Sequence, residues 1–213
     1  MPKNATAEKT EEFRWSDRSL DRREQHRLRK TALLKMAARA FNETSYYTTT
    51  LDDLAKRLNV TKPTLYYYVK NKDDILFGCQ HMAFDYIKDA LDEAETGDGP
   101  GMEKLRHFLT RFARLMTEDA GACLIRTGIK PLKAESQSKL RAFAKRLDRA
   151  LRGIIEVGIA DGSIRPCNPR LASYAIFSGF AGIAQWFDPE GEFDIDEVTE
   201  TYLDLFGRAL APE

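Results

Sequence analysis

Apolar residues recur at helical spacing along most of the chain. Leu33, Ala37 and Phe41, for example, follow one another at one-turn intervals and place their side chains on one face of a helix. No stretch of any length shows the period-two alternation that a half-buried strand requires. The pattern predicts an all-α protein whose helices cover about residues 21–44, 51–58, 61–68, 72–95, 102–118, 121–133, 136–160, 169–187 and 195–210.

Breaks and biased segments divide this helical pattern. Residues 1–20 are polar and mixed in charge, which predicts a flexible arm. Residues 96–101, Thr-Gly-Asp-Gly-Pro-Gly, form the clearest break in the chain. The longest uncharged stretch, residues 171–187, is shorter than the ~20 apolar residues that a membrane span needs, so we interpret it as a buried helix.

The distribution of charge adds a second feature. The 213-residue chain is 43% hydrophobic and 31% charged, as is typical of a globular protein, and its formal net charge is zero. Residues 1–75 hold sixteen Lys or Arg against eleven Asp or Glu, whereas the remainder holds seventeen against twenty-two. A basic first part is typical of a nucleic-acid-binding head on a body that does not bind nucleic acid. Chance variation among surface residues is the alternative explanation.

Residues that commonly bind metals are scattered. Cys79, Cys123 and Cys167 are odd in number and form no Cys-x-x-Cys pair, so the sequence predicts neither a disulfide framework nor a zinc site. The histidines at positions 26, 81 and 107 do not cluster either, and we expect no metal and no cofactor. Free thiols and the absence of an apolar leader favour a cytoplasmic protein with no membrane partner.

Two short helices around residues 51–68 are joined by a tight turn. Thr50 and Asp53 have the spacing of a capping box at the start of the first helix. Asn59 suits the turn because asparagine tolerates left-handed backbone angles. Thr61 can cap the second helix, and Pro63 is tolerated in its first turn, where amides lack helical partners. The arrangement predicts a helix-turn-helix.

The second of these helices has the chemistry of a DNA-recognition helix. A helix fits the major groove and presents its N-terminal residues to base edges. Lys62 can donate to guanine, Thr64 can offer hydroxyl and methyl contacts, and tyrosine phenols and the Lys72 ammonium can reach phosphates. Thr50 can offer a backbone amide to a phosphate. The candidate DNA-binding residues are Thr50, Thr61, Lys62, Pro63, Thr64, Tyr66, Tyr68 and Lys72.

Residues 28–77 resemble the DNA-binding head of the TetR family of repressors. The resemblance is carried by the run from Pro63 to Lys72, in which Thr-Leu-Tyr precedes an apolar residue and a lysine that opens the next helix. Asn59 departs from the family pattern, where glycine is usual. Packing of the three tyrosines is the structural alternative to DNA contact. The resemblance implies a three-helix domain at residues 21–75 that binds double-stranded operator DNA, and a larger helical ligand-binding and dimerisation domain at residues 76–213.

The body carries apolar side chains that suit either a packed core or a ligand pocket. The stretch at 171–187 is apolar on every face, and Gly179 and Gly182 permit close approach of another helix. With the final helix it would form the homodimer interface that the resemblance implies; packing within one chain is the alternative. The candidate ligand-binding residues are Phe108, Phe112, Leu124, Phe143, Leu147 and Phe177.

Further patterns bear on the ligand. Residues 185–192 resemble a Trp-aromatic-x-Pro-x-Gly turn of TetR relatives that respond to coenzyme A thioesters, so the expected small-molecule effector is apolar or acyl, with acyl-CoA among the candidates. Four arginines can meet a phosphate or carboxylate, although solvated helix faces have the same composition. They are Arg111, Arg114, Arg126 and Arg146.

Two functions follow from these observations. The first is a ligand-responsive repressor that binds a palindromic operator as a dimer and is released by its effector. In it, the helix at 74–95 transmits the effect of ligand to DNA, and the helix at 102–118 moves first because the break at 96–101 lets it shift independently. The alternative is an all-helical enzyme, although no phosphate loop, nucleophile elbow, zinc-protease motif or dinucleotide fingerprint is present.

Overall fold

The computed structural model describes residues 21–212, so the arm predicted for residues 1–20 lies outside the described residues. Within this range all regular secondary structure is helical, which confirms the all-α prediction. The head consists of α1 (Arg22–Thr44), α2 (Leu51–Arg57) and α3 (Lys62–Tyr68). The body contains α4 (Lys72–Thr96), α5 (Gly101–Thr117), α6 (Asp119–Thr127), α7 (Ala134–Ala160), α8 (Pro169–Trp186) and α9 (Ile195–Leu210).

The predicted caps of the head are confirmed. The Thr50 hydroxyl accepts from the Asp53 amide at 3.1 Å, and the Asp53 carboxylate accepts from the Thr50 amide at 2.9 Å, which completes a capping box. Asn59 has a φ of 52°, as a left-handed turn requires. The Thr61 hydroxyl then accepts from the Thr64 amide at 3.4 Å and begins α3. Local sequence is therefore sufficient to specify this helix pair.

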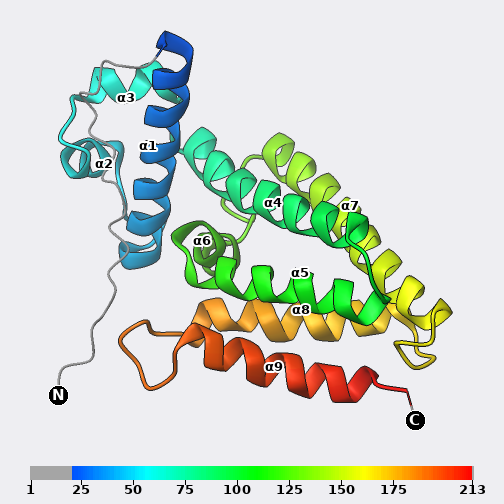
Figure 1. Cartoon of the computed structure of the whole chain (residues 1–213). Coiled ribbons are helices and arrows are strands. Elements are labelled where there is room, and N and C mark those ends of the chain that lie inside the picture. Colours follow the sequence, from blue (N-terminus) through cyan, green and yellow to red (C-terminus); the bar gives the residue numbers. More distant parts are fainter. Residues whose placement is uncertain (1–20, 213) are drawn as a thin grey trace.

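The body is built around α5. This helix packs against α4 and α7 on one side and against α8 and α9 on the other, and its Phe108 and Phe112 are almost fully buried. Figure 1 shows the head standing to one side, with α4 leading from it into the body. The arrangement makes α4 the direct continuation of the head into the body.

Two side-chain contacts fasten the head to the body. The buried thiol of Cys79 on α4 donates to the carbonyl of Leu34 on α1 at 3.2 Å. The Asn42 amide at the far end of α1 donates to the carbonyl of Asp119 on α6 at 3.0 Å. Because α1 is held at two points, a shift of α4 or α6 would carry the head with it.

The predicted helix at 121–133 is wrong in its bounds. The structure places it at Asp119–Thr127, and Gly128 follows with a φ of 62°. The Gly128 carbonyl accepts from the buried amide of Gln80 on α4 at 2.5 Å, so tertiary contact fixes the break. The prediction extended the helix to residue 133 because apolar residues keep a helical spacing beyond Gly128. This spacing does not show where a residue of another helix makes contact.

The premise that α5 begins loosely is also wrong. The amide of Gly101 donates to the Asp161 carboxylate at 2.7 Å, and the amide of Met102 donates to the Ser163 hydroxyl at 3.0 Å. A Cβ added at Gly101 would lie 2.2 Å from the backbone nitrogen of Gly158 on α7. The glycine-rich segment therefore permits close packing of α5 on α7, and does not free α5 to shift independently.

Candidate nucleic-acid interface and ligand pocket

The leading end of α3 is open to solvent. Thr61, Lys62 and Pro63 are exposed. Thr64 is half-buried, and its hydroxyl lies 2.8 Å from that of Thr61. Leu65, one position on, is buried between the helices of the head. The helix thus presents the four residues predicted from the sequence on one accessible end.

The three consecutive tyrosines divide between surface and core. Tyr66 and Tyr67 are exposed, whereas Tyr68 is only 8% exposed and its ring lies 4.9 Å from that of His26 on α1. We therefore exclude Tyr68 from the candidate interface, since its ring packs within the head. Tyr68 is therefore a packing residue, as the structural alternative to DNA contact proposed. The phenol of Tyr66 remains accessible to solvent.

Thr50 is also used internally. Its amide, predicted to face a phosphate, donates to the Asp53 carboxylate at 2.9 Å. Its hydroxyl is within 2.6 Å of the same carboxylate. The capping box occupies the groups that the prediction assigned to DNA, so Thr50 positions α2 and its amide is not free for a phosphate.

The two candidate lysines have different surroundings. Lys62 forms an ion pair with Asp52 of α2 at 2.9 Å, and this carboxylate raises the pKa of the lysine. Lys72 lies 4.4 Å from the centre of the Tyr46 ring and donates to the Tyr47 carbonyl at 3.3 Å. Partial burial lowers the pKa of Lys72. Both cations are therefore held in place by contacts within the chain.

One candidate contact was missed in the sequence. Tyr47 lies in the connection between α1 and α2 and is 73% exposed. Its carbonyl accepts a hydrogen bond from the Lys72 ammonium. The connection is rich in tyrosine and threonine, but this composition alone does not show that it folds back against the start of α4.

A pocket of about 340 Å³ lies in the body between α4, α5, α7 and α8. Three of the six predicted ligand-binding residues line it, namely Phe108, Leu147 and Phe177. The prediction missed one wall, which α4 supplies, and the polar part of the lining. The remaining lining residues are Phe84, Ile87, Leu91, Ala144, Lys145, Asp148, Leu151, Ser173, Tyr174 and Ser178.

The other predicted residues lie behind or away from this pocket. Phe112 stacks on Phe108 and Phe177, with ring centres 5.6 and 4.8 Å apart, and so supports the lining without forming it. Phe143 packs against His81 at 4.9 Å, and Leu124 is buried on α6. The wall on α4 has a recognisable spacing in the sequence, because Phe84, Ile87 and Leu91 fall on one helical face.

Polar groups gather at the α7–α8 side of the pocket. Asp148 pairs with Arg152 one turn further along α7 and accepts from the Ser173 hydroxyl at 3.4 Å. Arg170 donates to the Tyr174 hydroxyl at 3.1 Å and lowers the pKa of this phenol. The pocket is therefore apolar within and carries charge at one side.

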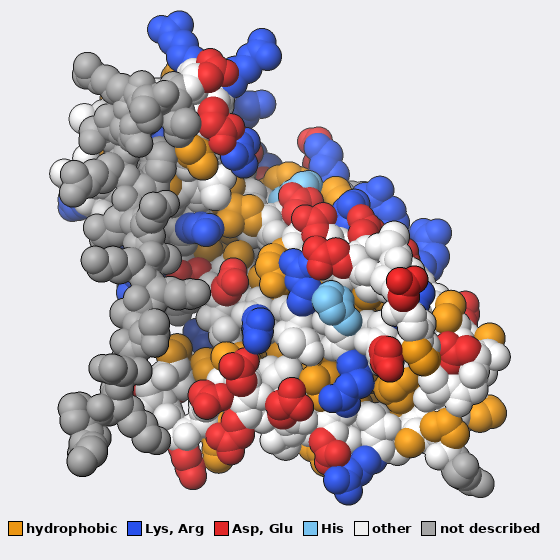
Figure 2. Space-filling view, viewed as in Figure 1, with side chains coloured by type: hydrophobic (Ala, Val, Ile, Leu, Met, Phe, Trp, Pro, Cys, Tyr) orange, Lys and Arg blue, Asp and Glu red, His pale blue; other side chains and the backbone are white. Residues whose placement is uncertain are grey.

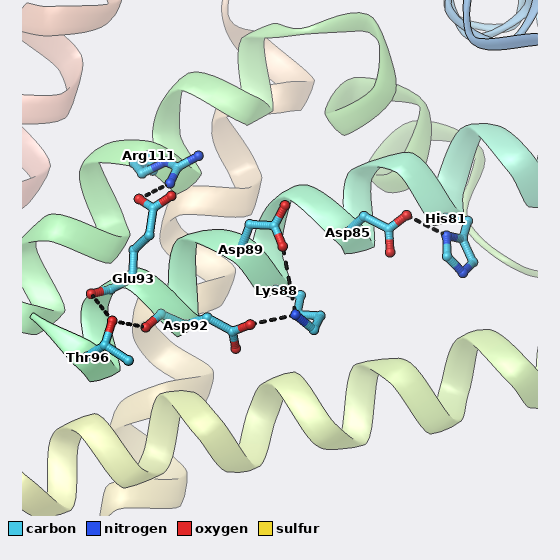
Figure 3. A network of polar contacts seen from close by, with 8 residues as sticks. All are labelled: His81, Asp85, Lys88, Asp89, Asp92, Glu93, Thr96 and Arg111. Atoms are coloured by element: carbon cyan, nitrogen blue, oxygen red, sulfur yellow. Dashed lines mark hydrogen bonds and ion pairs between the residues drawn. The ribbon is translucent and has the colours of Figure 1, made fainter. Parts of the chain in front are cut away.

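Four arginines were predicted to meet an anion. Within residues 21–212, the lining of this pocket includes none of them. Arg111 pairs with Glu93 on α4, Arg114 pairs with Asp196 at 3.2 Å, and Arg126 donates to the Ala184 carbonyl at 2.6 Å. Arg146 lies 4.5 Å from the centre of the Phe143 ring. Arg111, Arg114 and Arg126 therefore join neighbouring elements of the body, whereas Arg146 contacts a ring on its own helix. Figure 3 shows the α4 network that ends at Arg111, with His81, Asp85, Lys88, Asp89, Asp92, Glu93 and Thr96.

An apolar surface remains on α8 and α9. Leu171 is 64% exposed and Leu205 is 59% exposed. A Cβ at Gly179 would lie 2.8 Å from the Phe206 ring, so this glycine permits α9 to approach, while Gly182 has no described atom within 4 Å of its Cβ position. In Figure 2 acidic side chains are prominent in the lower part, where Figure 1 places α9.

Within residues 21–212 the side chains form no group of three or more metal-binding residues. In the same part of the chain, every helix is too short or too polar to cross a bilayer.

Two family models match the chain. The model for bacterial regulatory proteins of the tetR family matches residues 33–79. The model for the tetracyclin repressor-like C-terminal domain matches residues 98–210, which is more than half of the chain.

Known proteins give the same result. HTH-type transcriptional regulator HbdR from Aromatoleum sp. (strain CIB) is 26% identical over 149 residues, which cover 70% of this chain and 65% of HbdR, just under two thirds. The crystal structure of PfmR, a TetR family transcriptional regulator from Thermus thermophilus, has a TM-score of 0.76 and 30% identity, covering 83% of this chain and 97% of PfmR. AibR, crystallised in complex with isovaleryl coenzyme A and operator DNA, has a TM-score of 0.75 and 23% identity, covering 86% of this chain and 98% of AibR.

Proposed function

Since the chain belongs to the TetR family of bacterial transcriptional regulators, we propose that it is a repressor that binds a palindromic operator as a homodimer and responds to a small acyl effector. The observation that carries the proposal is the placement of α4. This helix begins with Lys72 beside the head and lines the pocket with Phe84, Ile87 and Leu91. The family is one of regulators and not of enzymes, and we place its action in the cytoplasm, with the operator.

The head binds DNA through the open end of α3. In the major groove Lys62 exchanges Asp52 for the acceptor edge of a guanine, and Thr64 contacts a neighbouring base. The phosphate contacts come from Tyr66 on α3 and from Tyr47 and Lys72, which are hydrogen-bonded to each other. Exchange of one carboxylate for DNA costs little, because the Lys62–Asp52 pair is exposed and water screens such pairs.

The pocket has the size and lining of a small-ligand site. Its volume of about 340 Å³ is at the lower end of the ~300–1,000 Å³ that is typical of ligand pockets. Aromatic and aliphatic side chains form most of its wall, which favours an acyl or aromatic group. The complex of the similar protein AibR with isovaleryl coenzyme A supports an acyl thioester.

The effect of ligand reaches DNA through α4 and α7. Ligand contacts α4 directly, and the Asp73 carboxylate in its first turn accepts from the Lys133 amide at 2.6 Å and from the Ser136 hydroxyl at 2.9 Å, at the start of α7. A ligand changes DNA affinity only if it prefers one spacing of the two heads. A coupling free energy of ~1–3 kcal/mol would change operator affinity by ~5–150-fold.

The homodimer forms through α8 and α9. Its interface is the apolar surface that includes Leu171, Gly182 and Leu205, and two α8–α9 pairs would meet as a four-helix bundle. A two-fold axis through this bundle presents two copies of α3 to two half-sites of an inverted repeat.

A filled pocket tests this function. Fluorescence anisotropy on DNA from upstream of the chain's own gene measures operator affinity with and without fatty acids, acyl thioesters and aromatic acids. Leu147→Trp places a large ring in the pocket, so we expect operator binding to persist while the ligand effect is lost. Phe143→Trp is the matched control on the same helix, because Phe143 lies outside the pocket lining and its variant should keep the response.

Each result has a clear reading. Operator binding that no compound of these classes changes would overturn the effector assignment. An equal loss of response in both variants would show that the pocket has no specific part in it. AibR is described in one complex with both effector and operator, so the assay counts a change of either sign.

A further inference from the structure

One stretch of α7 has an unusual charge. Between residues 139 and 152 it holds six Lys or Arg against the single carboxylate of Asp148. Figure 2 shows blue side chains along the upper right edge of the molecule, where Figure 1 places α7. The acidic surplus of the body therefore does not extend to this helix.

Part of this charge lies at the pocket. Lys145 belongs to the lining, and its side chain makes no ion pair within residues 21–212. Arg149 folds back so that its Nε donates to the Lys145 carbonyl at 3.4 Å. Arg152 pairs with Asp148, which also belongs to the lining. Arg170 of α8 reaches the same rim through its hydrogen bond to Tyr174. We call Lys145, Arg149, Arg152 and Arg170 the basic rim.

An unused donor points to a missing acceptor at this rim. The Nε atom of Arg152 is buried and has no hydrogen-bond acceptor among the described residues. A buried donor without a partner costs free energy, so such groups usually have a water or an anion as acceptor. Guanidinium groups stay charged at all ordinary pH values and bind phosphate oxygens in bidentate geometry.

We propose that the basic rim binds the phosphates of an acyl carrier, so that the effector is a coenzyme A thioester whose acyl group fills the pocket. This inference rests on the proposed function and adds a second, anionic subsite to it. The four cations of the basic rim surround one protein carboxylate, that of Asp148. The single carboxylate of a free fatty acid would not neutralise the remaining positive charge. The pyrophosphate and the ribose phosphate of coenzyme A carry enough negative charge to match it. The thioester would lie at the mouth between the two subsites.

Three probes separate the acyl subsite from the phosphate subsite. Isothermal titration calorimetry on the full-length protein compares isovaleryl-coenzyme A, the phosphate-free isovaleryl-N-acetylcysteamine and free isovaleric acid. We expect the coenzyme A thioester to bind at least about 10-fold more tightly than the phosphate-free thioester, and its advantage to shrink as salt rises, because charge pairs at an open rim are screened.

Paired charge deletions on α7 give the matched control. Lys145→Ala with Arg149→Ala removes two cations of the rim and should reduce affinity for the coenzyme A thioester about 10-fold, while leaving the phosphate-free thioester unchanged. Lys139→Ala with Arg141→Ala removes the same charge further along the helix, from residues that pair with Glu135 and Gln137, and should change neither affinity appreciably.

The outcomes distinguish this inference from the proposed function. Equal affinity for the two thioesters, or equal losses in the two double variants, overturns the phosphate subsite and leaves the acyl pocket standing. If the three probes and their octanoyl counterparts all fail to bind, the acyl effector itself is wrong, and the phosphate subsite with it.

Discussion

The two lysines of the proposed DNA interface differ in what holds them. Lys62 is held by a single exposed carboxylate on α2, and it lies at the exposed leading end of α3. Lys72 lies against the Tyr46 ring at the start of the helix that leads to the ligand pocket. In the proposed complex the first would read a base, and the second would hold a phosphate at the start of α4.

Replacement of these lysines should have different effects on DNA binding. Lys62→Ala should cost ~1–3 kcal/mol on the operator and relax sequence preference, because a base contact is lost. Lys72→Ala should weaken all sequences alike and reduce the salt dependence by about one phosphate contact. Anisotropy titrations at several salt concentrations measure both quantities.

The control is Lys35→Ala, which removes an exposed cation from α1. It should leave sequence preference and the salt slope close to those of the wild type. Wild-type operator affinity in both Lys62→Ala and Lys72→Ala would contradict the assigned DNA interface.

At the scale of elements, α5 is positioned by its first residue. Gly101 is tightly packed, and its amide and that of Met102 donate to side chains beyond the end of α7. The start of α5 is therefore a fixed point of the body, and movement after ligand binding is expected in α4, which carries one wall of the pocket.

Gly101→Ala should destabilise the fold. Its Cβ would lie 2.2 Å from the backbone nitrogen of Gly158, so α5 and α7 must separate, at a cost of about 1–3 kcal/mol for overpacking. Gly153→Ala is the control on α7, because its Cβ meets no described atom within 4 Å and alanine favours a helix by roughly 0.5–1 kcal/mol. Urea unfolding measures both, and equal stabilities of the two variants would refute the close packing.

At the scale of the whole molecule, the apolar surface of α8 and α9 requires a covering. Trp186 adds to the exposed apolar area contributed by Leu171 and Leu205. Exposed large apolar side chains on two neighbouring helices are typical of an interface between subunits. In the proposed dimer this surface would also set the distance between the two copies of α3, and with it the operator spacing that the protein can bind.

Gly182→Arg should break the dimer. The substitution places a charge on the proposed interface, where no described atom of the same chain lies within 4 Å of the Cβ position, so the fold of one chain should tolerate it. Light scattering at micromolar concentration should show dimers for the wild type and monomers for the variant, with weaker operator binding. Gly153→Arg, equally open but on α7, should remain dimeric; a monomeric wild type would reject the interface.

The sequence by itself determined the features that depend on neighbouring residues. Helical periodicity determined the fold class, and the caps at Thr50 and Thr61 and the turn at Asn59 determined the helix pair of the head. These features follow from hydrogen bonds and backbone angles within a few residues, which a sequence displays directly. Because these local features are visible in the sequence, the resemblance of residues 28–77 to the TetR head could be specific.

The tertiary structure alone decided everything that depends on distant partners. Gln80 ends α6 at Gly128, Asp161 and Ser163 hold the start of α5, and His26 covers Tyr68. In the pocket, apolar residues of α4 and α5 have the same composition whether they line a cavity or fill a core. Which of them face empty volume depends on how far apart the helices pack, and that distance is set by contacts between side chains far apart in the sequence.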